Sequence, residues 1–421
     1  MKPLLPSSEL RRTPVLQKAW RAIKENALSS SSKTTRKEAR LFDERLSENI
    51  RSIQRSLKKG YCFQNALGVE IPKKSGGSRG LVIAPIRDRV VQRAILNTLY
   101  QQDAPALRAV LDEPASVGGL PGKGVSDAIR EIERTRRQWG RLFVAGSDIS
   151  GFFTKVQVEP VVDFIRENVE DAEFTELFRR ALVVNLSNAN LLSPSQLALF
   201  PSDGIGIAQG CPLSALAGNI YLREFDTEMN TGDVVCLRYI DDFIVLCRTE
   251  AEASKSLNRA RLLLADLGLS IYDPSRHPNK AFIGPLSYRI HFLGHALEPE
   301  KYPPTQENID NLIRGISRDA DGFFEHVRLL REGRRTSRRQ SYAATLSAID
   351  QRVMAWSGAF SAMRCEETAA RIDQEIDKQV SRVINQYARF QRQVPRHRLL
   401  GVHHVIDDII ISGGAADSEA A

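Results

Sequence analysis

Apolar residues recur at helical spacing near both ends of the chain. In residues 13–60 they predict helices interrupted by a serine-rich loop at 29–34, with Gly60 ending the second helix. From about residue 305 the spacing returns through Ile309, Leu312 and Ile316 and continues as far as Ile384. Both ends of the chain are therefore expected to be helical.

Between these regions, short apolar runs predict strands. Residues 68–85 have the pattern of strand, glycine turn and strand, residues 142–148 form an apolar run ending in an acid, and residues 234–247 form two apolar runs around adjacent acids. Further strands are expected at 269–273 and 288–297. Helical spacing covers 86–101, 159–182, 213–230 and 251–267. The alternation predicts an α+β fold with a helical C-terminal part.

The distribution of charge along the chain indicates a possible binding partner. The 421 residues carry a net charge of +8, and residues 1–60 alone hold 15 Lys and Arg against 6 Asp and Glu. Residues 311–345 add 8 Arg against 4 acids. Such patches suit a polyanion, because phosphates neutralised by Lys and Arg release counterions. A solvated basic surface explains the same charges, so charge alone does not establish nucleic-acid binding.

Other features indicate a cytoplasmic protein without a membrane partner. No apolar run approaches the roughly 18 residues that span a bilayer, and the first residues do not form a secretory signal. The five cysteines form no Cys-x-x-Cys pair and are expected to be reduced thiols.

The adjacent acids Asp241 and Asp242 carry the candidate chemistry. A tight hairpin would expose both at its tip, where carboxylates repel one another and require a cation. Mg²⁺ suits such ligands and leaves positions open for phosphates. Asp148, at the end of its own apolar run, is the best third ligand for two metal ions, which in such sites lie roughly 3.5–4 Å apart. The alternative is an ordinary solvent-facing acidic turn.

Six ordered segments give the chain a wider resemblance. They are Tyr239-Ile240-Asp241-Asp242, Asp148-Ile149-Ser150-Gly151-Phe152-Phe153, and residues 207–222, 71–92, 116–129 and 292–295. Over residues 15–300 the chain resembles the reverse transcriptases of the bacterial branch related to group II intron enzymes. It looks most like the free-standing unknown-group or defence-associated enzymes. Ala208 and Cys211 depart from the family's usual Pro-Gln-Gly-Ser-Pro-Leu-Ser segment.

The resemblance implies a right-hand polymerase with fingers and palm, built from an antiparallel sheet and helices, and an all-helical thumb. The expected boundaries are a basic N-terminal extension at 1–60, fingers at 61–140, palm at 141–300, thumb at 301–412 and a disordered tail at 413–421.

It also implies roles for individual residues. Asp148 and Asp241 would bind two Mg²⁺ ions, with Mn²⁺ as an alternative. Asp242 would support the second carboxylate or contact a metal ion, and the backbone carbonyl of Ile149 would be an additional ligand. Phe153 would be the steric gate that excludes a ribose 2′-hydroxyl and so favours dNTPs.

Further roles belong to the substrates. The nucleotide contacts would be Lys73, Lys74, Arg79 and Gln209, and the primer grip would be Phe292, Leu293 and Gly294. In this family a Lys usually follows the strand expected at 269–273. Either Arg276 or Lys280 could take that place, although Arg is a poor proton donor.

The function implied is RNA-directed DNA synthesis from dNTPs on an RNA template, with a DNA product or primer. The expected template is a non-coding RNA and the expected role is bacterial antiviral defence. The alternatives are a group II intron-type reverse transcriptase or maturase, a retron enzyme, and a non-catalytic RNA-binding maturase.

Overall fold

The protein forms two compact units, which are described separately. The structure is a computed structural model that describes residues 5–73, 76–287, 289–334 and 336–402. Residues 1–124 and 135–285 make the first unit, and residues 125–134 and 286–421 make the second. The tail predicted at 413–421 lies outside the described residues, and the predicted subdomain boundaries stay predictions.

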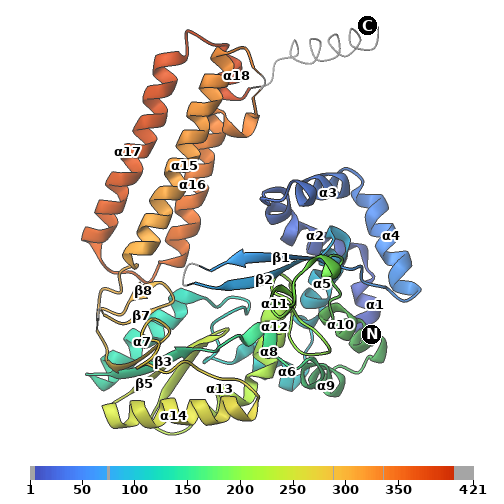
Figure 1. The fold of residues 1–421 in the computed structure, drawn as a ribbon, viewed down its shortest axis with the longest axis vertical. Helices are drawn as coiled ribbons and strands as arrows, with labels where there is room; N and C mark the ends of the chain where they lie inside the picture. Colours follow the sequence, from blue (N-terminus) through green and yellow to red (C-terminus); the bar gives the residue numbers. More distant parts are fainter. Residues whose placement is uncertain (1–4, 74–75, 288, 335, 403–421) are drawn as a thin grey trace. The chain divides into compact units, whose positions relative to one another are not determined.

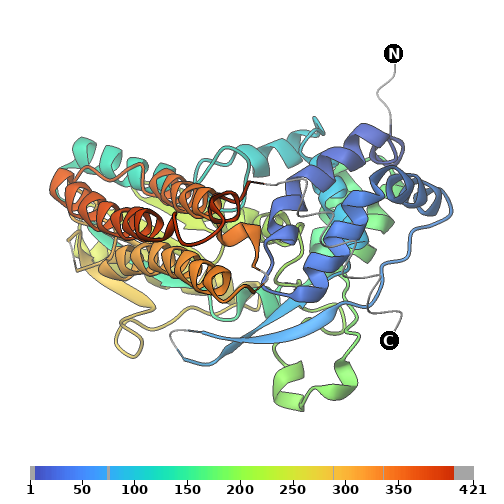
Figure 2. The same cartoon turned by 90° about the horizontal axis from the view of Figure 1, so that it is seen from above.

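In the first unit, N-terminal helices surround a central helix, α5 (Ile86–Leu99). These are α1 (Pro6–Leu10), α2 (Thr13–Leu28), α3 (Lys33–Glu44) and α4 (Leu46–Lys58), drawn in blue in Figure 2. The helical prediction for 13–60 is confirmed, with one difference. The backbone of Arg45 leaves the helical region at φ −114° and ψ 35°, so the second predicted helix is two helices, α3 and α4.

A four-stranded antiparallel sheet lies in the same unit, in the order β4-β5-β3-β6. Its strands are β3 (Phe143–Asp148), β4 (Val235–Tyr239), β5 (Asp242–Cys247) and β6 (Ala281–Pro285). The inner strand β5 is buried from Phe243 to Cys247, which explains its unbroken apolar run. Helix α14 (Glu250–Asp266) packs on β3, β5 and β6, and α13 (Arg223–Met229) packs on β4 (Figure 1).

The strand prediction holds for β3, β4 and β5 but fails at 269–273, and in the range 288–297 the structure has two short paired strands, β7 (His291–Phe292) and β8 (His295–Ala296). Residues 269–273 form only an isolated bridge, between Ile271 and Ile149. The backbone N–H of Tyr272 donates to the Ser147 hydroxyl (3.0 Å) rather than to a strand carbonyl. The edge strand β6 was missed, because its short sequence ends in Gly284 and Pro285, residues that normally argue against a strand.

The glycine-turn hairpin predicted at 68–85 is confirmed as β1 (Leu67–Pro72) paired with β2 (Ser78–Ile83). The helices predicted at 159–182 and 213–230 are each divided into two shorter helices. The remaining helices of the unit are α6 (Pro105–Asp112), α8 (Phe152–Lys155), α9 (Val158–Asn168), α10 (Ala172–Leu182), α11 (Pro194–Leu197) and α12 (Ser214–Tyr221). One apolar core joins the N-terminal helices to the sheet, from Leu10 to Leu269.

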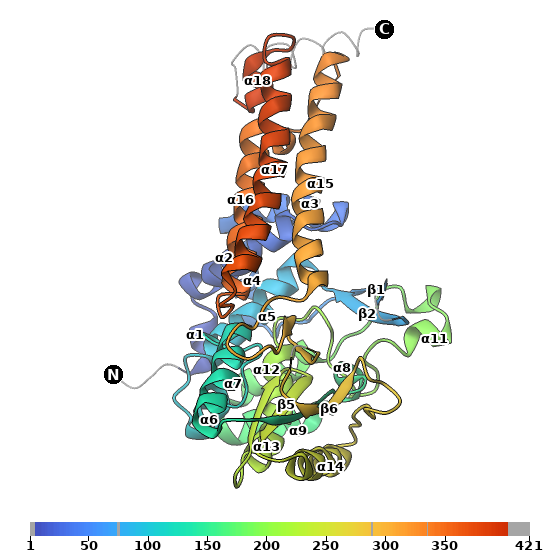
Figure 3. The same ribbon diagram turned by 90° about the vertical axis from the view of Figure 1, so that its left-hand side faces the viewer.

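The second unit is helical, as expected. In it α15 (Gln306–Arg331) runs beside both α16 (Tyr342–Ala359) and α17 (Glu366–Phe390), as Figures 1 and 3 show. Its core includes Ile316, Phe323 and Val383. The unit also contains α18 (Arg396–Leu400), the hairpin β7 (His291–Phe292) and β8 (His295–Ala296), and residues 125–134 of α7 (Val125–Trp139).

The α+β architecture with antiparallel sheets and a helical C-terminal part is thereby confirmed. None of the helices among the described residues is long and apolar enough to cross a membrane.

Candidate active site

The ends of two inner strands bring the three predicted acids together. Asp148, the last residue of β3, pairs in register with Asp242, the first residue of β5. Asp241 occupies the two-residue connection between β4 and β5, and its carbonyl oxygen accepts a hydrogen bond from the Ile149 N–H (2.8 Å). All three acids are half-buried, so the hairpin tip does not expose Asp241 and Asp242 as expected. The tip instead lies against the end of β3, where Asp148 pairs with Asp242.

Burial and the charges of neighbouring carboxylates raise the pKa values of Asp241 and Asp242. Burial raises the pKa of Asp241 to about 6, and the charge of Asp148 acts in the same direction, against the charges of Lys280 and Lys73. Burial likewise raises the pKa of Asp242 to about 7, together with the charges of Asp148 and Asp241. The acids therefore lie in a site where more positive charge would be stabilising.

Lys280 supplies part of that charge. Its Nζ lies 2.6 Å from Oδ2 of Asp148 and 5.8 Å from the ring centre of Tyr272. Burial alone would lower the pKa of Lys280, but the hydrogen bond and the charge of Asp148 raise it overall. Arg276, the other candidate for this position, is exposed. The structure thus places Lys280 against the acids.

The turn that carries Asp241 is strained. Ile240 has φ 60°, a left-handed conformation that β-branched residues rarely adopt. In two-residue hairpin loops a positive φ at this first position normally selects glycine. Such a conformation costs on the order of 1–3 kcal/mol and persists where the surroundings impose it. Here Gly118 lies directly against the turn, since a Cβ on Gly118 would stand 2.6 Å from the Ile240 nitrogen.

Two further predicted residues, Phe153 and Gln209, lie on segments that are hydrogen-bonded to each other. Phe152 is buried in the core, whereas Phe153 is half-buried, which separates the two aromatic residues of the motif. The carbonyl of Phe153 accepts from the Ile207 N–H (2.7 Å), and the carbonyl of Gln209 accepts from the Val82 N–H in β2 (2.8 Å). Gln209 is therefore tied to the base of the β1–β2 hairpin.

The predicted phosphate-binding cations lie on the β1–β2 hairpin. Lys73 and Arg79 are both exposed, and Gly76 and Gly77 turn the chain between them with φ 88° and 74°. The pKa of Asp241 is raised overall, but Lys73 is close enough for its charge to act against that rise. Lys74 lies outside the described residues.

The predicted primer grip belongs to the second unit. Leu293 and Gly294 connect β7 to β8 with φ 49° and 82°, and the Gly294 carbonyl accepts from the Thr305 N–H (2.8 Å) at the start of α15. A Cβ on Gly294 would stand 2.7 Å from the Asn308 side chain, which explains the glycine. Phe292 itself is buried.

One charged residue near the acids was not predicted. Arg238, in β4, is fully buried and forms an ion pair with Asp226 of α13. An arginine inside an apolar strand is a recognisable sequence signal, because a buried charge needs a partner. Its partner lies twelve residues away on a helix and could not be identified without the fold.

Divalent metal ions fit the site by charge and ligand chemistry. Among the described residues no cluster of three or more His, Cys, Asp or Glu side chains forms a ready-made metal cage. Asp148, Asp241 and Asp242 nevertheless present hard oxygen ligands, and burial together with the charges of neighbouring carboxylates raises the pKa values of Asp241 and Asp242. Those are the ligands that Mg²⁺ and Mn²⁺ prefer.

Comparison with known proteins places these residues in a family. The model for "Reverse transcriptase (RNA-dependent DNA polymerase)" matches residues 71–297. Protein YkfC of Escherichia coli (strain K12) is 29% identical over 197 residues, which are 44% of this chain and 46% of YkfC. Group II intron-encoded protein LtrA of Lactococcus lactis subsp. cremoris is 30% identical over 186 residues, 42% of this chain and 28% of LtrA. The matches thus span less than half of either relative.

Among solved structures, a chain of the "Cas6-RT-Cas1--Cas2 complex" aligns with a TM-score of 0.36 and 16% identity, covering 90% of this chain and 50% of that chain.

Proposed function

Because this chain belongs to the reverse transcriptase family, we propose that it is an RNA-directed DNA polymerase that extends a primer with dNTPs on an RNA template. The observation that carries the proposal is the convergence of Asp148, Asp241 and Asp242 at the ends of β3 and β5, with Lys280 against them. Enzymes of this family generally use divalent metal ions, and a pair of Mg²⁺ ions supplies charge for the attacking and leaving oxygens of phosphoryl transfer.

In this proposal Asp148 and Asp241 hold the metal ions and Asp242 supports them, with the carbonyl of Ile149 as a further ligand. Mn²⁺ is an alternative to Mg²⁺. The raised pKa values of Asp241 and Asp242 mean that both carboxylates take up a proton at a higher pH than an ordinary aspartate does, and a proton competes with a metal ion for the same oxygens. Metal binding therefore displaces protons, and it becomes easier as the pH rises.

The cations have separate roles. Lys73, Lys74 and Arg79 on the open hairpin would hold the triphosphate of the incoming nucleotide, Arg79 through its bidentate fork. Lys280 is the better of the two candidates for a proton donor to the departing pyrophosphate, because it contacts Asp148 and a lysine can release a proton. Lys280 occupies Oδ2 of Asp148, so a metal ion that binds this oxygen would displace the contact.

The remaining assignments concern the sugar, the template and the primer. Phe153 would pack against the sugar and exclude a 2′-hydroxyl, and Gln209 would contact the nucleotide beside it. Phe292, Leu293 and Gly294 would hold the primer end.

The test is primer extension by the purified protein with a defined RNA template, DNA primer, dNTPs and Mg²⁺. Asp241→Asn keeps the size of the side chain but removes its charge, and we expect activity to fall roughly a thousandfold, since metal-borne stabilisation is worth several kcal/mol. Asp233→Asn, at an exposed position before β4, is the matched control and is expected to retain activity. An inactive wild-type protein, or an active Asp241→Asn variant, would contradict the proposal.

We propose further that the template is a non-coding RNA and that the enzyme acts in bacterial antiviral defence. A group II intron-type role is the second candidate, favoured by the similarity to a group II intron-encoded protein over 42% of the chain. Sequencing the RNA and cDNA that co-purify with the protein separates them. A structured non-coding RNA supports the first role, and excised intron RNA supports the second.

A further inference from the structure

Behind the acidic turn lies a buried polar cluster, here called the Arg238 network, made of Arg238, Asp226, Asn219 and Ser116. Arg238 has no exposed surface, and Asp226 and Asn219 are each 2% exposed. The guanidinium Nε donates to Oδ1 of Asp226 (2.6 Å), and Nη2 pairs with the other oxygen of the same carboxylate. The result is a bidentate ion pair between β4 and α13.

The other donors of Arg238 reach three different parts of the chain. Nη1 donates to Oδ1 of Asn219 (2.9 Å) and to the carbonyl oxygen of Ile240 (2.9 Å), and Nη2 donates to the hydroxyl of Ser116 (3.1 Å). With the two bonds to Asp226, this uses all five N–H groups of an arginine. One of the five acceptors belongs to the strained residue directly before Asp241.

The network also holds residues 116–118, whose Gly118 lies against the backbone nitrogen of Ile240. Asn219 donates from Nδ2 to the Gly118 carbonyl (3.0 Å), and Ser116 donates to Oδ1 of Asn219 (3.0 Å). The backbone of Arg238 pairs with Ala115 and Val117 through two bonds of 2.8 Å. The Ile240 backbone is therefore held between the guanidinium and Gly118.

From these contacts we infer that Arg238 is a positioning residue for catalysis: it holds the Ile240 carbonyl so that Asp241 stays directed at Asp148. This inference rests on the proposed function. A buried ion pair adds little net stability compared with well-packed apolar residues, so stability alone gives weak reason for an arginine here. A planar fork that meets five acceptors at fixed directions is instead suited to orientation.

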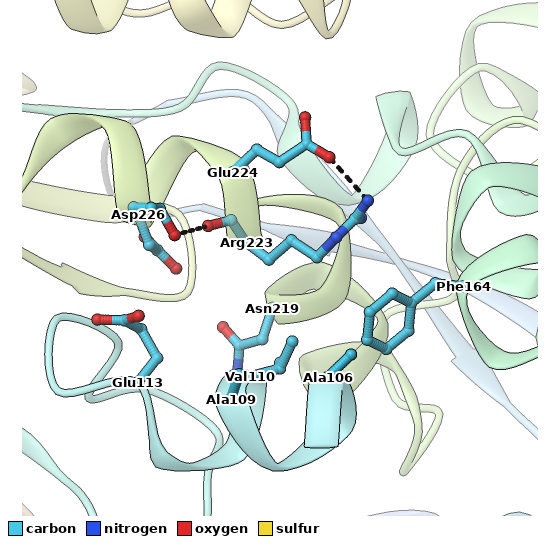
Figure 4. Close-up of a pocket in the computed structure, with 10 residues that line it drawn as sticks. Ala106, Ala109, Val110, Glu113, Phe164, Asn219, Arg223, Glu224 and Asp226 are labelled. Carbon is cyan, nitrogen blue, oxygen red and sulfur yellow. Dashed lines mark hydrogen bonds and ion pairs between the residues drawn. The ribbon is translucent and has the colours of Figure 1, made fainter. Parts of the chain in front are cut away.

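A pocket gives access to this network. It has a volume of about 250 Å³, and its lining includes Asn219, Asp226, Ala106, Val110 and Phe164 (Figure 4). Two direct partners of Arg238 thus border a cavity that can admit a small ion. A guanidinium ion in that cavity would lie next to the carboxylate that Arg238 normally binds.

The test compares Arg238→Lys with wild type in steady-state primer extension and in Mn²⁺ titration followed by electron paramagnetic resonance. Lysine keeps the charge but cannot meet all five acceptors, so we expect kcat to fall about 100-fold, as for other small misplacements of reacting groups. The KM for dNTP should change less than about threefold, because the triphosphate contacts are elsewhere. Mn²⁺ should bind about tenfold more weakly, an effect typical of residues that orient metal ligands.

Arg259→Lys is the matched control, because Arg259 forms an exposed ion pair with Glu228 between α14 and α13. It should match wild type in kcat and in Mn²⁺ affinity. An inactive wild-type protein contradicts the proposed function. An active wild type with an equally active Arg238→Lys variant of unchanged Mn²⁺ affinity overturns the positioning role alone.

Two more variants keep the inference testable if Arg238→Lys does not fold. Ser116→Ala leaves the ion pair intact but removes the hydroxyl that accepts from Arg238 and donates to Asn219. It should fold and lower kcat by about three- to tenfold, the effect of losing such hydrogen bonds. Wild-type kcat in this variant would overturn the inference. Arg238→Ala should regain part of its kcat with guanidinium, at concentrations that do not unfold the wild type, and not with Na⁺. Equal effects of the two ions would count against a specific site.

Discussion

Two antiparallel hairpins of the first unit carry opposite charges at their tips and are built in opposite ways. The β4–β5 hairpin places Asp241 and Asp242 against β3, and its strands are largely buried. The β1–β2 hairpin has exposed Lys73 and Arg79 side chains, and among the residues that the structure describes no atom outside the chain neighbours lies within 4 Å of a Cβ placed on Gly76 or Gly77. The acids of the first hairpin are therefore enclosed by packing, whereas the described residues on either side of the second hairpin's turn are exposed.

The difference follows from what each tip is proposed to do. Carboxylates that share metal ions must keep their mutual geometry within a fraction of an ångström, and a buried frame provides this. Cations that attract a triphosphate act over longer distances and gain from flexible side chains on an open loop. The buried hairpin needs a left-handed Ile240 to place its acids, whereas the open hairpin turns on glycines that adopt such angles without strain.

The largest expected effect comes from replacing a glycine by alanine at each hairpin: Gly118, which contacts the β4–β5 turn, and Gly76, which is part of the β1–β2 turn. In Gly118→Ala the new Cβ would meet the Ile240 nitrogen at 2.6 Å, so backbone must move and Asp241 with it. We expect kcat to fall about 100-fold. We also expect a destabilisation of about 1–3 kcal/mol, measured by denaturant unfolding.

Gly76→Ala is the counterpart on the open hairpin. Gly76 has φ 88°, and none of the described residues would contact a Cβ there, so we expect the cost of the substitution to be local backbone strain of about 1–2 kcal/mol. We expect less than a threefold change in kcat, since the strain does not reach the acids. Equal losses of kcat in the two variants would remove the distinction between an enclosed and an open hairpin.

The second prediction concerns the open tip itself. In Arg79→Ala the bidentate donor is lost, and we expect KM for dNTP to rise about tenfold with kcat changed less than threefold, as expected for a contact made equally in ground and transition states. Arg166→Ala, at an exposed ion pair with Asp163 on α9, is the control with unchanged kinetics. A fall in kcat without a change in KM would place Arg79 in the chemistry rather than in binding.

The two hairpins also differ in how well the sequence predicts them. Both were expected from their patterns, because the apolar runs before Asp148 and around Asp241 and the glycine turn after Lys73 are local signals. The Arg238 network was missed because its members come from four segments, and only the fold brings Ser116, Asn219 and Asp226 to Arg238.

The sequence left the choice between Arg276 and Lys280 open for a similar reason. Both follow Tyr272 in one irregular segment, and the sequence does not specify how that segment turns. In the structure the N–H groups of Arg276 and His277 bond to the Asp273 carbonyl, and the Lys280 N–H bonds to the His277 carbonyl. These turns bring Lys280 beside Asp148 and leave Arg276 in solvent. Chain reversals of this kind depend on tertiary contacts more than on composition.

The smallest expected effect is on stability, and it tests whether the enclosed tip is strained by its own charge. The pKa of Asp242 is raised to about 7 in the folded protein, whereas in the unfolded chain it is about 3.9. Between these two pH values the folded metal-free protein therefore holds a proton that the unfolded chain has released. This contribution to stability is fully present below about pH 4 and is lost as the pH rises through about 7. Asp242→Asn removes the charge, so the metal-free variant should exceed wild type in unfolding free energy at pH 8 by about 1 kcal/mol, a value discounted because the side chain is half-buried. At pH 4 the two proteins should be nearly equal in unfolding free energy.

Thermal unfolding in EDTA at both pH values measures the difference, and addition of Mg²⁺ at pH 8 should stabilise wild type more than the variant. A variant less stable than wild type at pH 8 would show that Asp242 stabilises the metal-free hairpin, and that enclosing the acids carries no electrostatic cost.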